Sequence, residues 1–346
     1  MVVVIPADAR PPPDRIALLR HGVNITNWFR FPARSDAASI RTYLSDLAMA
    51  ELHRAGFSFV RLAVQPEFLL AEPQRIDWLR EAVMRLEQQG LAVVVELHPT
   101  TWHLETTDAP KLLAAWRRLG PALARFDPRL TFVEPVNEPV FPHNEAAWEA
   151  LQLQVLAVVR GALPNTTVVL TGNDWSSVDG LRGLQPVPDS NVIYTVHLYD
   201  PAVLTSLAAY LPGLDRRALA ALPFPVNDPS TCLRPTTDQA TANVMHAYCA
   251  DGWTAARLAS RLQIAVDWGT AHNAAVMVGE FGATHALNAP ARLAWLTSVR
   301  QTAERDGMGW ALWGLEDQMG FDLPRPPPQQ PRLDPAVLAA LGLHPP

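Results

Sequence analysis

The fold of this chain is decided by a short pattern, Leu91-Ala-Val-Val-Val-Glu-Leu-His98, that recurs along its length. The run is almost wholly apolar and ends in the polar side chain of His98, as in a parallel strand covered by helices on its outer side. Before it, residues 74–89 carry apolar side chains three and four positions apart and are followed by Gly90, which is typical of a helix and its end. Together these segments predict one helix–strand unit of an α/β protein.

Working outward, seven further runs of the same kind complete a repeating pattern. The expected strands are 21–28, 57–64, 91–98, 130–138, 167–171, 192–199, 275–280 and 309–314. The helices expected between them are 39–55, 74–89, 111–125, 145–160, 255–270 and 290–305. Eight strands that alternate with helices at steps of roughly 25 to 40 residues predict a (β/α)8 TIM barrel.

One step is much longer than the rest. Between the sixth and seventh strands, residues 200–252 form an insertion at the face where barrel enzymes carry their active sites. It contains Cys232 and Cys249, for which one local disulfide and two free thiols both remain open. Residues 324–331 form a Pro-rich C-terminal segment that we expect to be extended. We therefore expect a single catalytic domain over residues 1–346.

Composition excludes several classes of protein. Apolar residues make up 49% of the chain and charged residues 18%, which is enough for a large core and argues against disorder. The formal net charge is −6 with no basic run, so we expect no nucleic-acid partner. Because no apolar run reaches the roughly 18 residues of a membrane helix, we expect no membrane span.

Polar side chains gather at the expected carboxyl ends of the strands, where barrels place their chemistry. Glu138 ends the fourth strand and Glu280 the seventh, so the two face each other across the barrel. Two such carboxylates can cleave a glycosidic bond, one as acid/base and one as nucleophile. We expect Arg61 to keep Glu280 ionised and Glu138 to lie in drier surroundings. Among other nearby acids, we expect Glu134 to be a buried structural group and Glu316 and Asp317 to lie in a solvated loop.

Aromatic and imidazole side chains lie at the same strand ends. Trp28, Trp102, Trp175 and Trp313 suit a carbohydrate site, because the C–H faces of sugars pack on aromatic rings. His98, His103 and His197 could suggest a metal site. The first strand, however, carries Asn24-Ile-Thr26 where barrel metallohydrolases usually offer a His-x-His pair. We therefore expect no metal and no organic cofactor.

Seven motifs resemble glycoside hydrolase family 5, the cellulase-type retaining β-glycosidases, from about residue 20 to 320. They are Gly22-Val-Asn-Ile-Thr-Asn-Trp28, Val60-Arg-Leu62, Glu96-Leu-His98, Val136-Asn-Glu-Pro139, His197-Leu-Tyr199, Gly279-Glu-Phe-Gly282 and Trp310-Ala-Leu-Trp313. The resemblance implies that Glu138 is the acid/base and Glu280 the nucleophile. It also implies supporting or substrate-binding roles for Arg61, His98, Asn137, His197, Tyr199 and Trp313.

The implied activity is retaining hydrolysis of a β-linked oligo- or polysaccharide, with an endo-β-1,4-glucanase (cellulase) as the first expectation. β-Mannanase, β-1,3-glucanase and glycolipid-directed β-glycosidase are alternatives within the family, because the insertion fits no particular subfamily. A non-catalytic carbohydrate-binding barrel is the alternative from another class. We expect a monomer that is secreted or periplasmic, with any signal peptide absent from this chain.

Overall fold

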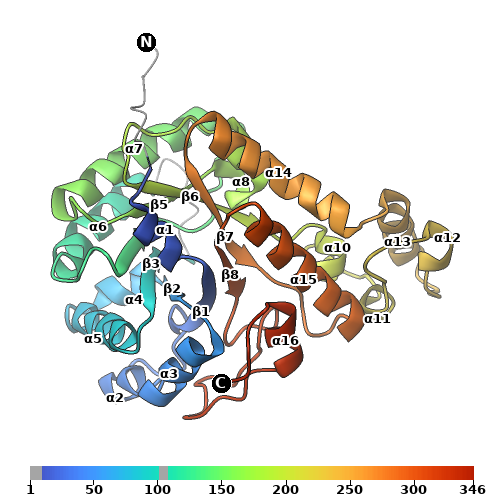
Figure 1. Ribbon diagram of the computed structural model, residues 1–346, viewed down its shortest axis with the longest axis horizontal. Coiled ribbons are helices and arrows are strands. Elements are labelled where there is room, and N and C mark those ends of the chain that lie inside the picture. Colours follow the sequence, from blue (N-terminus) through green and yellow to red (C-terminus); the bar gives the residue numbers. More distant parts are fainter. Residues whose placement is uncertain (1–9, 101–107) are drawn as a thin grey trace.

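The chain forms a closed barrel of eight parallel strands wrapped by helices (Figure 1), in a computed structural model that describes residues 10–100 and 108–346. Each strand pairs with the next in sequence, and β8 pairs with β1 to close the ring. The strands are β1 (His21–Phe29), β2 (Phe59–Val64), β3 (Ala92–Leu97), β4 (Thr131–Glu134), β5 (Val168–Thr171), β6 (Val192–Leu198), β7 (Ala275–Phe281) and β8 (Trp310–Trp313). The predicted (β/α)8 barrel is thus confirmed.

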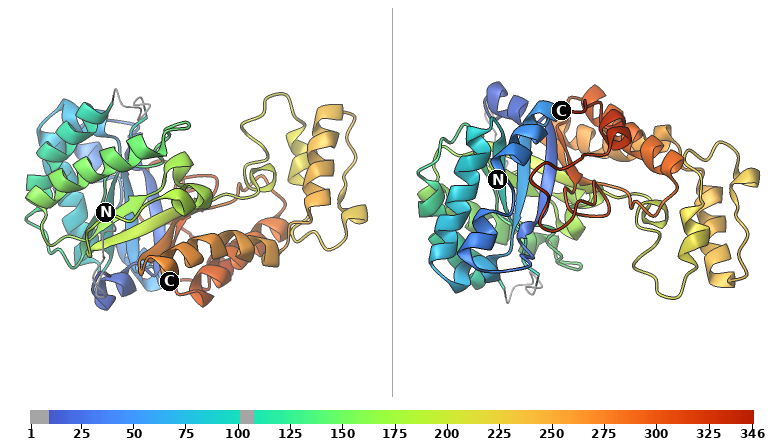
Figure 2. Two further views of the ribbon diagram at one scale, coloured as in Figure 1. Left: turned by 90° about the horizontal axis from the view of Figure 1, so that it is seen from above. Right: turned by 90° about the horizontal axis from the view of Figure 1, so that it is seen from below.

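The long helices lie on the outside of this ring, where the sequence pattern predicts them (Figures 1 and 2). The larger ones are α5 (Gln74–Gln88), α6 (Ala109–Leu123), α7 (Glu145–Ala162), α14 (Ala255–Ala271) and α15 (Ala289–Arg305). Shorter ones are α1 (Pro13–Leu18), α4 (Pro66–Ala71), α8 (Asn173–Ser176), α9 (Val178–Gly183) and α16 (Pro335–Ala340). None of the helices within the described ranges is long and apolar enough to cross a membrane.

Two predicted boundaries are wrong, each for a local reason. The single helix expected over 39–55 is two helices, α2 (Ala37–Arg41) and α3 (Asp46–Ala55). The Ser45 hydroxyl accepts a hydrogen bond from the Ala48 amide and so begins the second helix. β4 ends at Glu134 instead of Glu138, because Pro135 has no amide hydrogen with which to continue the ladder.

Core side chains alternate between the two faces of the barrel wall along β2 and β3. In β2, Phe59 packs inside the barrel, whereas Val60 and Leu62 pack outward in the main core beneath the helices. Since successive side chains point to opposite faces, Arg61 shares the inner face with Phe59. The same alternation puts Glu96 on the inner face of β3 with Val94. The polar side chains near the carboxyl ends of the strands are therefore directed into the barrel.

The insertion between β6 and α14 projects away from the barrel (Figures 1 and 2). It contains α10 (Ala202–Thr205), α11 (Arg216–Ala220), α12 (Pro229–Cys232) and α13 (Gln239–Asp251). A disulfide between Cys232 and Cys249 joins α12 to α13, which settles the alternative left open by the sequence. The side-chain amide of Asn288, before α15, donates to the Ala220 and Leu222 carbonyls at 2.9 and 2.7 Å and anchors the insertion.

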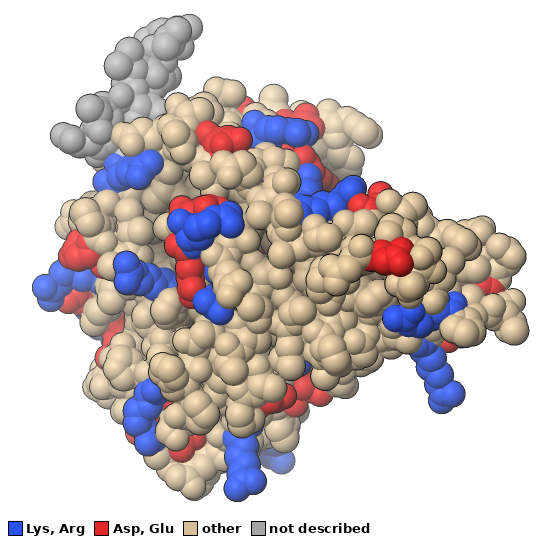
Figure 3. Space-filling view, turned by 45° about the vertical axis from the view of Figure 1, so that its right-hand side comes forward, with Lys and Arg blue, Asp and Glu red and all other residues tan. Residues whose placement is uncertain are grey.

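Charged side chains of both signs are interspersed on the face shown in Figure 3. Several charged side chains of the protein form close pairs, such as Arg41 with Glu81 and Arg160 with Asp189, at 2.6 Å each. That face carries no continuous basic surface of the kind that binds a nucleic-acid backbone.

Candidate active site

Arg61 lies fully buried at the centre of the polar end of the barrel. Its Nε and Nη2 atoms each donate to Glu134 at 2.7 Å, so the two groups form a bidentate pair. Nη1 donates to Glu280 at 2.6 Å and to the Asn24 side-chain oxygen at 2.9 Å, and Nη2 donates to Asn137 Oδ1 at 2.8 Å. Burial by itself would lower the pKa of Arg61, but the surrounding carboxylates raise it well above its ordinary value. Arg61 therefore stays charged and fixes the side chains around it.

Glu280, near the end of β7, is held through both of its oxygens. Besides the Arg61 bond to Oε1, the Tyr199 hydroxyl donates to Oε2 at 2.8 Å, and His197 Nδ1 lies 3.5 Å from Oε2. Burial favours a higher pKa for this carboxyl, but the charges of His197 and Arg61 outweigh it and lower the pKa below its ordinary value. Glu280 is therefore ionised at neutral pH, as the sequence predicts.

Glu138 lies four residues beyond β4, between Asn137 and Pro139. Its φ of 40° is in the left-handed region, which is rare for a residue with a side chain and is concentrated at functional sites. Its side chain is 23% exposed against 4% for Glu280, so the expectation that Glu138 is the drier of the two is wrong. Its position on a turn past the strand, instead of inside the sheet, explains that access.

His197 connects the two carboxylates. Its Nδ1 lies 2.9 Å from Glu138 Oε1, while its buried Nε2 has no partner within the described residues. Burial alone would lower the pKa of His197, but the charge of Glu280 and the bond with Glu138 raise it. One ligand atom each from Glu138, His197 and Glu280 lies within 4.8 Å of the others. This close approach is typical of a nucleophile and its acid/base, whose carboxyl groups lie roughly 5 to 5.5 Å apart, and leaves less room than the 6.5 Å or more that accommodates an attacking water.

A second buried chain of hydrogen bonds orients Asn137. Its Oδ1 accepts from Arg61, so its Nδ2 faces His98 Nε2, 3.1 Å away, and donates to it. The other ring nitrogen of His98 lies 3.1 Å from Glu96 Oε2 and donates to that carboxylate. Burial lowers the pKa of His98 well below its ordinary value, which keeps the ring neutral and in this tautomer. Glu96 thereby controls the direction of Asn137 through His98.

The predicted aromatic residues separate into different environments. The Trp313 ring lies 5.6 Å from that of His98, with 8% of the residue exposed, and Trp175 is 60% exposed. Trp28, however, is fully buried, stacks on Tyr43 at 5.7 Å and donates its indole N–H to the Ile40 carbonyl. The prediction that Trp28 contacts substrate is therefore wrong, because its ring packs in the core beneath α2. Trp102 lies outside the described residues.

The other acidic residues near the strand ends differ in how well the sequence predicts their surroundings. Glu134 is the structural partner of Arg61 that we expected. Glu316 is not in a solvated loop but fully buried, where its carboxylate accepts from the Tyr43 hydroxyl at 2.6 Å and the Thr26 amide at 2.9 Å. Glu96 was not among the predicted site residues, although its position two residues before His98 places both on one face of β3.

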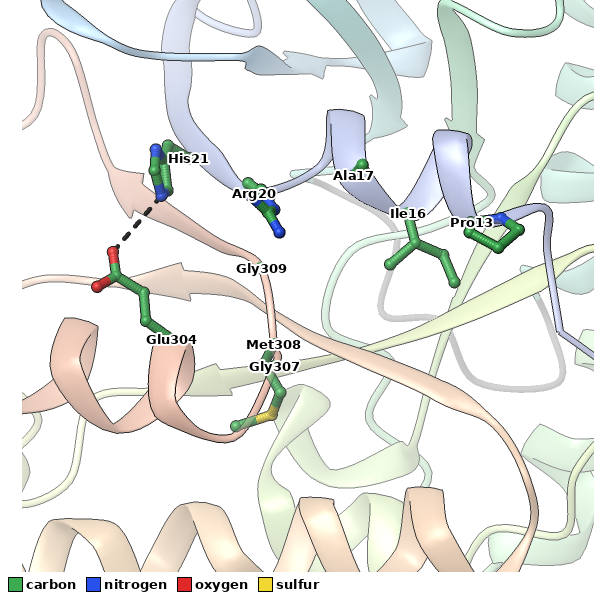
Figure 4. A pocket seen from close by; sticks show the side chains of 9 residues that line it. All are labelled: Pro13, Ile16, Ala17, Arg20, His21, Glu304, Gly307, Met308 and Gly309. Atoms are coloured by element: carbon green, nitrogen blue, oxygen red, sulfur yellow. Dashed lines mark ion pairs between the residues drawn. The ribbon is translucent and has the colours of Figure 1, made fainter.

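A cavity of about 400 Å³ lies at the opposite end of the barrel, where β1 and β8 begin (Figure 4). It is lined by residues such as Arg20, His21 and Glu304, and the last two lie 3.5 Å apart. That end of a barrel contributes stability and not catalysis, and none of the predicted site residues lies there.

The chain is similar to known proteins in sequence and in fold. The sequence profile of the family described as Cellulase (glycosyl hydrolase family 5) matches residues 21–318. "Endoglucanase 3" of Fibrobacter succinogenes is 22% identical over 86% of this chain, and "Endoglucanase C" of Acetivibrio thermocellus is 19% identical over 55% of it. The chain spans only 49% and 60% of the lengths of these two relatives.

Solved structures share the fold. The endoglucanase Cel5A of Thermotoga maritima superposes with a TM-score of 0.75 at 21% identity, covering 95% of this chain and 98% of its own. Another structure of that enzyme, in complex with mannotriose, gives a TM-score of 0.74 at 20% identity, covering 95% of this chain and 99% of its own. Because the family profile covers most of the barrel, the chain belongs to the cellulase family of glycosyl hydrolases, family 5.

Proposed function

We propose that this chain is a retaining β-glycoside hydrolase that cleaves a β-linked polysaccharide, with a β-1,4-glucan as the substrate of an endoglucanase. The observation that carries the proposal is the approach of Glu138 and Glu280: one oxygen of each lies within 4.8 Å of the other, and His197 Nδ1 lies 2.9 Å from Glu138 and 3.5 Å from Glu280. Family membership and relatives named endoglucanases support it.

The first chemical step forms a covalent glycosyl-enzyme. The ionised carboxylate of Glu280 attacks the anomeric carbon, while Glu138 gives its proton to the glycosidic oxygen and the C–O bond to the leaving sugar breaks. Arg61 and Tyr199 hold the two oxygens of Glu280 in place, so little reorganisation precedes the attack.

The second step reverses these roles. Glu138, now a carboxylate, takes a proton from water as the water oxygen attacks the anomeric carbon and Glu280 departs as the leaving group. His197 donates to Glu138 from Nδ1 and so steadies its negative charge between the two steps. The sugar is released with the configuration that it had in the substrate.

Other predicted residues have substrate-binding roles in this proposal. Asn137, oriented by Arg61 and His98, donates to or accepts from the 2-hydroxyl of the sugar at the cleavage point. Trp313 forms the floor under that sugar. Trp175 is exposed, and its backbone amide donates to the Pro139 carbonyl at 3.3 Å. In this proposal its ring packs against a sugar on the side of the leaving group.

We further propose that residues 1–346 form one catalytic domain with 200–252 as an insertion and act as a secreted or periplasmic monomer. Glu138, His197 and Glu280 carry atom types that can bind a metal ion, but neither of the two proposed chemical steps needs one. Activity without a metal or cofactor is therefore expected, and chelation with EDTA should leave turnover unchanged.

The test is the anomeric configuration of the first product, followed by proton NMR on soluble β-1,4-glucan, β-mannan and β-1,3-glucan. The β-anomer should appear first, and Glu280→Gln and Glu138→Gln should each abolish it. Initial release of the α-anomer would contradict the mechanism. Binding without cleavage of any of these glycans would indicate the non-catalytic barrel instead.

A further inference from the structure

Arg30, immediately after β1, has a partly buried side chain whose guanidinium has no polar partner within the described residues. Its Nε is shielded from solvent and has no hydrogen-bond partner, and within residues 10–100 and 108–346 no ion pair or hydrogen bond to Arg30 is found. Two other buried arginines have polar partners: Arg61 donates to four side chains, and Arg292 donates to the Ala283 carbonyl at 2.7 Å. Buried polar groups without partners are rare in proteins and call for an explanation.

The position of Arg30 places it at the catalytic end of the barrel. Its guanidinium lies 4.5 Å from the centre of the Phe31 ring and 5.6 Å from that of Trp313. The carboxylates whose charges act on it are Glu96, Glu280, Glu138 and Asp317. Arg30 therefore lies close enough to the catalytic pair to feel its charge, yet forms no ion pair with either member.

We propose that Arg30 is a substrate-binding residue whose guanidinium donates hydrogen bonds to adjacent hydroxyl groups of an uncharged sugar beside Trp313. This inference rests on the proposed glycosidase function. A planar guanidinium presents parallel N–H groups, which match two neighbouring oxygens of a sugar ring. The bound sugar supplies the partners that the protein withholds, and Trp313 holds the guanidinium in place through its ring face.

The charges around Arg30 favour a neutral ligand. The ionised carboxylate of Glu280 is among the acidic groups that act on it, so an incoming carboxylate, such as that of a uronic acid, would meet its repulsion. Hydroxyl groups accept the same hydrogen bonds without that cost. The recognised group is therefore a hexose or pentose diol and not an acidic sugar.

The test compares Arg30→Met and Arg30→Lys with the intact enzyme on an aryl β-cellobioside and on cellotetraose. Arg30→Met keeps a side chain of similar length but loses the donors, so KM should rise and kcat/KM fall by about 10- to 100-fold. Arg30→Lys keeps the charge without the planar fork and should recover only part of the loss. Arg34→Met is the matched control, because the Arg34 side chain is 77% exposed and pairs with Asp36; its KM should not change.

Several outcomes would overturn the inference. An unchanged KM in Arg30→Met would do so. So would full recovery in Arg30→Lys together with a shifted pH profile in Arg30→Met, since Arg30 would then act only through its charge on the catalytic pair. Faster cleavage of the matching glucuronoside than of the neutral substrate would refute the uncharged ligand.

A binding measurement distinguishes failure of the proposed glycosidase function from failure of the inference about Arg30. If the intact protein cleaves none of the substrates, calorimetric titration with cellotetraose still compares binding to the intact chain and to Arg30→Met. Weaker binding to the variant supports the role of Arg30, and equal binding refutes it. Thermal unfolding of each variant shows whether it is folded. If Arg30→Met is not folded, Arg30→Lys replaces it in the binding comparison.

Discussion

Nη1 of Arg61 lies 2.6 Å from Oε1 of Glu280, and both side chains are buried, with 0% of Arg61 and 4% of Glu280 exposed. The same guanidinium is fixed by Glu134 through its Nε and Nη2 atoms, so its direction cannot change without breaking a buried bidentate pair. Tyr199 holds the other oxygen of Glu280. The proposed nucleophile is thus placed and ionised from two sides before substrate binds.

Tyr199→Phe should move the acidic limb of the activity profile to higher pH. Glu280 acts as a carboxylate, and its pKa is lowered in part by the Tyr199 hydroxyl, so activity is lost as the pH falls through that pKa. Without this bond the pKa rises, and we expect a shift of up to about one pH unit with a roughly tenfold lower kcat/KM. The measurement is kcat/KM against pH on an aryl β-cellobioside.

The matched control for this variant is Tyr210→Phe, because Tyr210 is 63% exposed and carries its hydroxyl on the insertion. That control should reproduce the original profile. An acidic limb that stays in place in Tyr199→Phe would show that the hydroxyl does not govern the ionisation of Glu280.

Glu96→Gln should change how stability depends on pH. Burial raises the pKa of Glu96 from 4.5 to about 7, although Arg61 opposes this. Between these values the folded chain keeps a proton that the unfolded chain releases, so Glu96 makes the free energy of unfolding fall as pH rises. Glutamine does not titrate. Between pH 4.5 and 7.5 the free energy of unfolding of the variant should therefore fall by about 1 to 3 kcal/mol less than that of the intact protein. Urea unfolding at the two pH values measures this; parallel losses in both proteins would contradict it.

Trp175→Ala and Trp28→Ala should have opposite effects. Trp175 is 60% exposed, so Trp175→Ala should change the free energy of unfolding by no more than about 0.5 kcal/mol. It should raise KM for cellohexaose about 3- to 10-fold. Trp28 is fully buried, and Trp28→Ala should cost about 3 to 5 kcal/mol of stability with little change in KM. Kinetics and urea unfolding on both variants distinguish them; an unchanged KM in Trp175→Ala removes it from substrate binding.

Replacing Cys232 and Cys249 by serine should loosen the insertion without affecting the barrel. The disulfide joins residues 17 apart, and closing a loop of that length contributes about 3 kcal/mol. We expect faster hydrogen exchange and proteolysis within residues 200–252, with kcat/KM on an aryl β-cellobioside unchanged. A large loss of activity on this small substrate would show that the insertion supports the catalytic residues.

Local patterns in the sequence predict the strands closely, because the alternation of side chains along a strand depends only on its own residues. All eight predicted strands overlap the observed ones, and the clearest errors lie at ends. β4 stops at Glu134 because of Pro135, and Ser45 divides one expected helix in two. Capping and proline effects act on one or two residues, so periodicity alone does not locate them.

For the site, too, the sequence predicts part of the arrangement, and the folded chain determines the rest. The resemblance of short motifs to a known family names Arg61, Glu138 and Glu280, but not the direction in which their bonds run. Glu96 lies within a quoted motif, but the resemblance gives it no role, and Arg30 lies outside the motifs. The contacts of both residues appear only in the folded chain. Trp28 and Trp175 both lie at or just past the end of an expected strand. Only the packing of α2 over Trp28 separates this core residue from the exposed Trp175.

The sequence by itself determined the barrel, its order of strands and the residue types available at one end of it. Only the tertiary structure decided that Arg61 meets Glu280 across 219 residues of chain, and that the more exposed of the two glutamates is Glu138. The pattern of apolar residues that marks each helix or strand lies within its own segment of the sequence. Ionisation and access to water depend on which groups the closed barrel brings together, and no single segment carries that information.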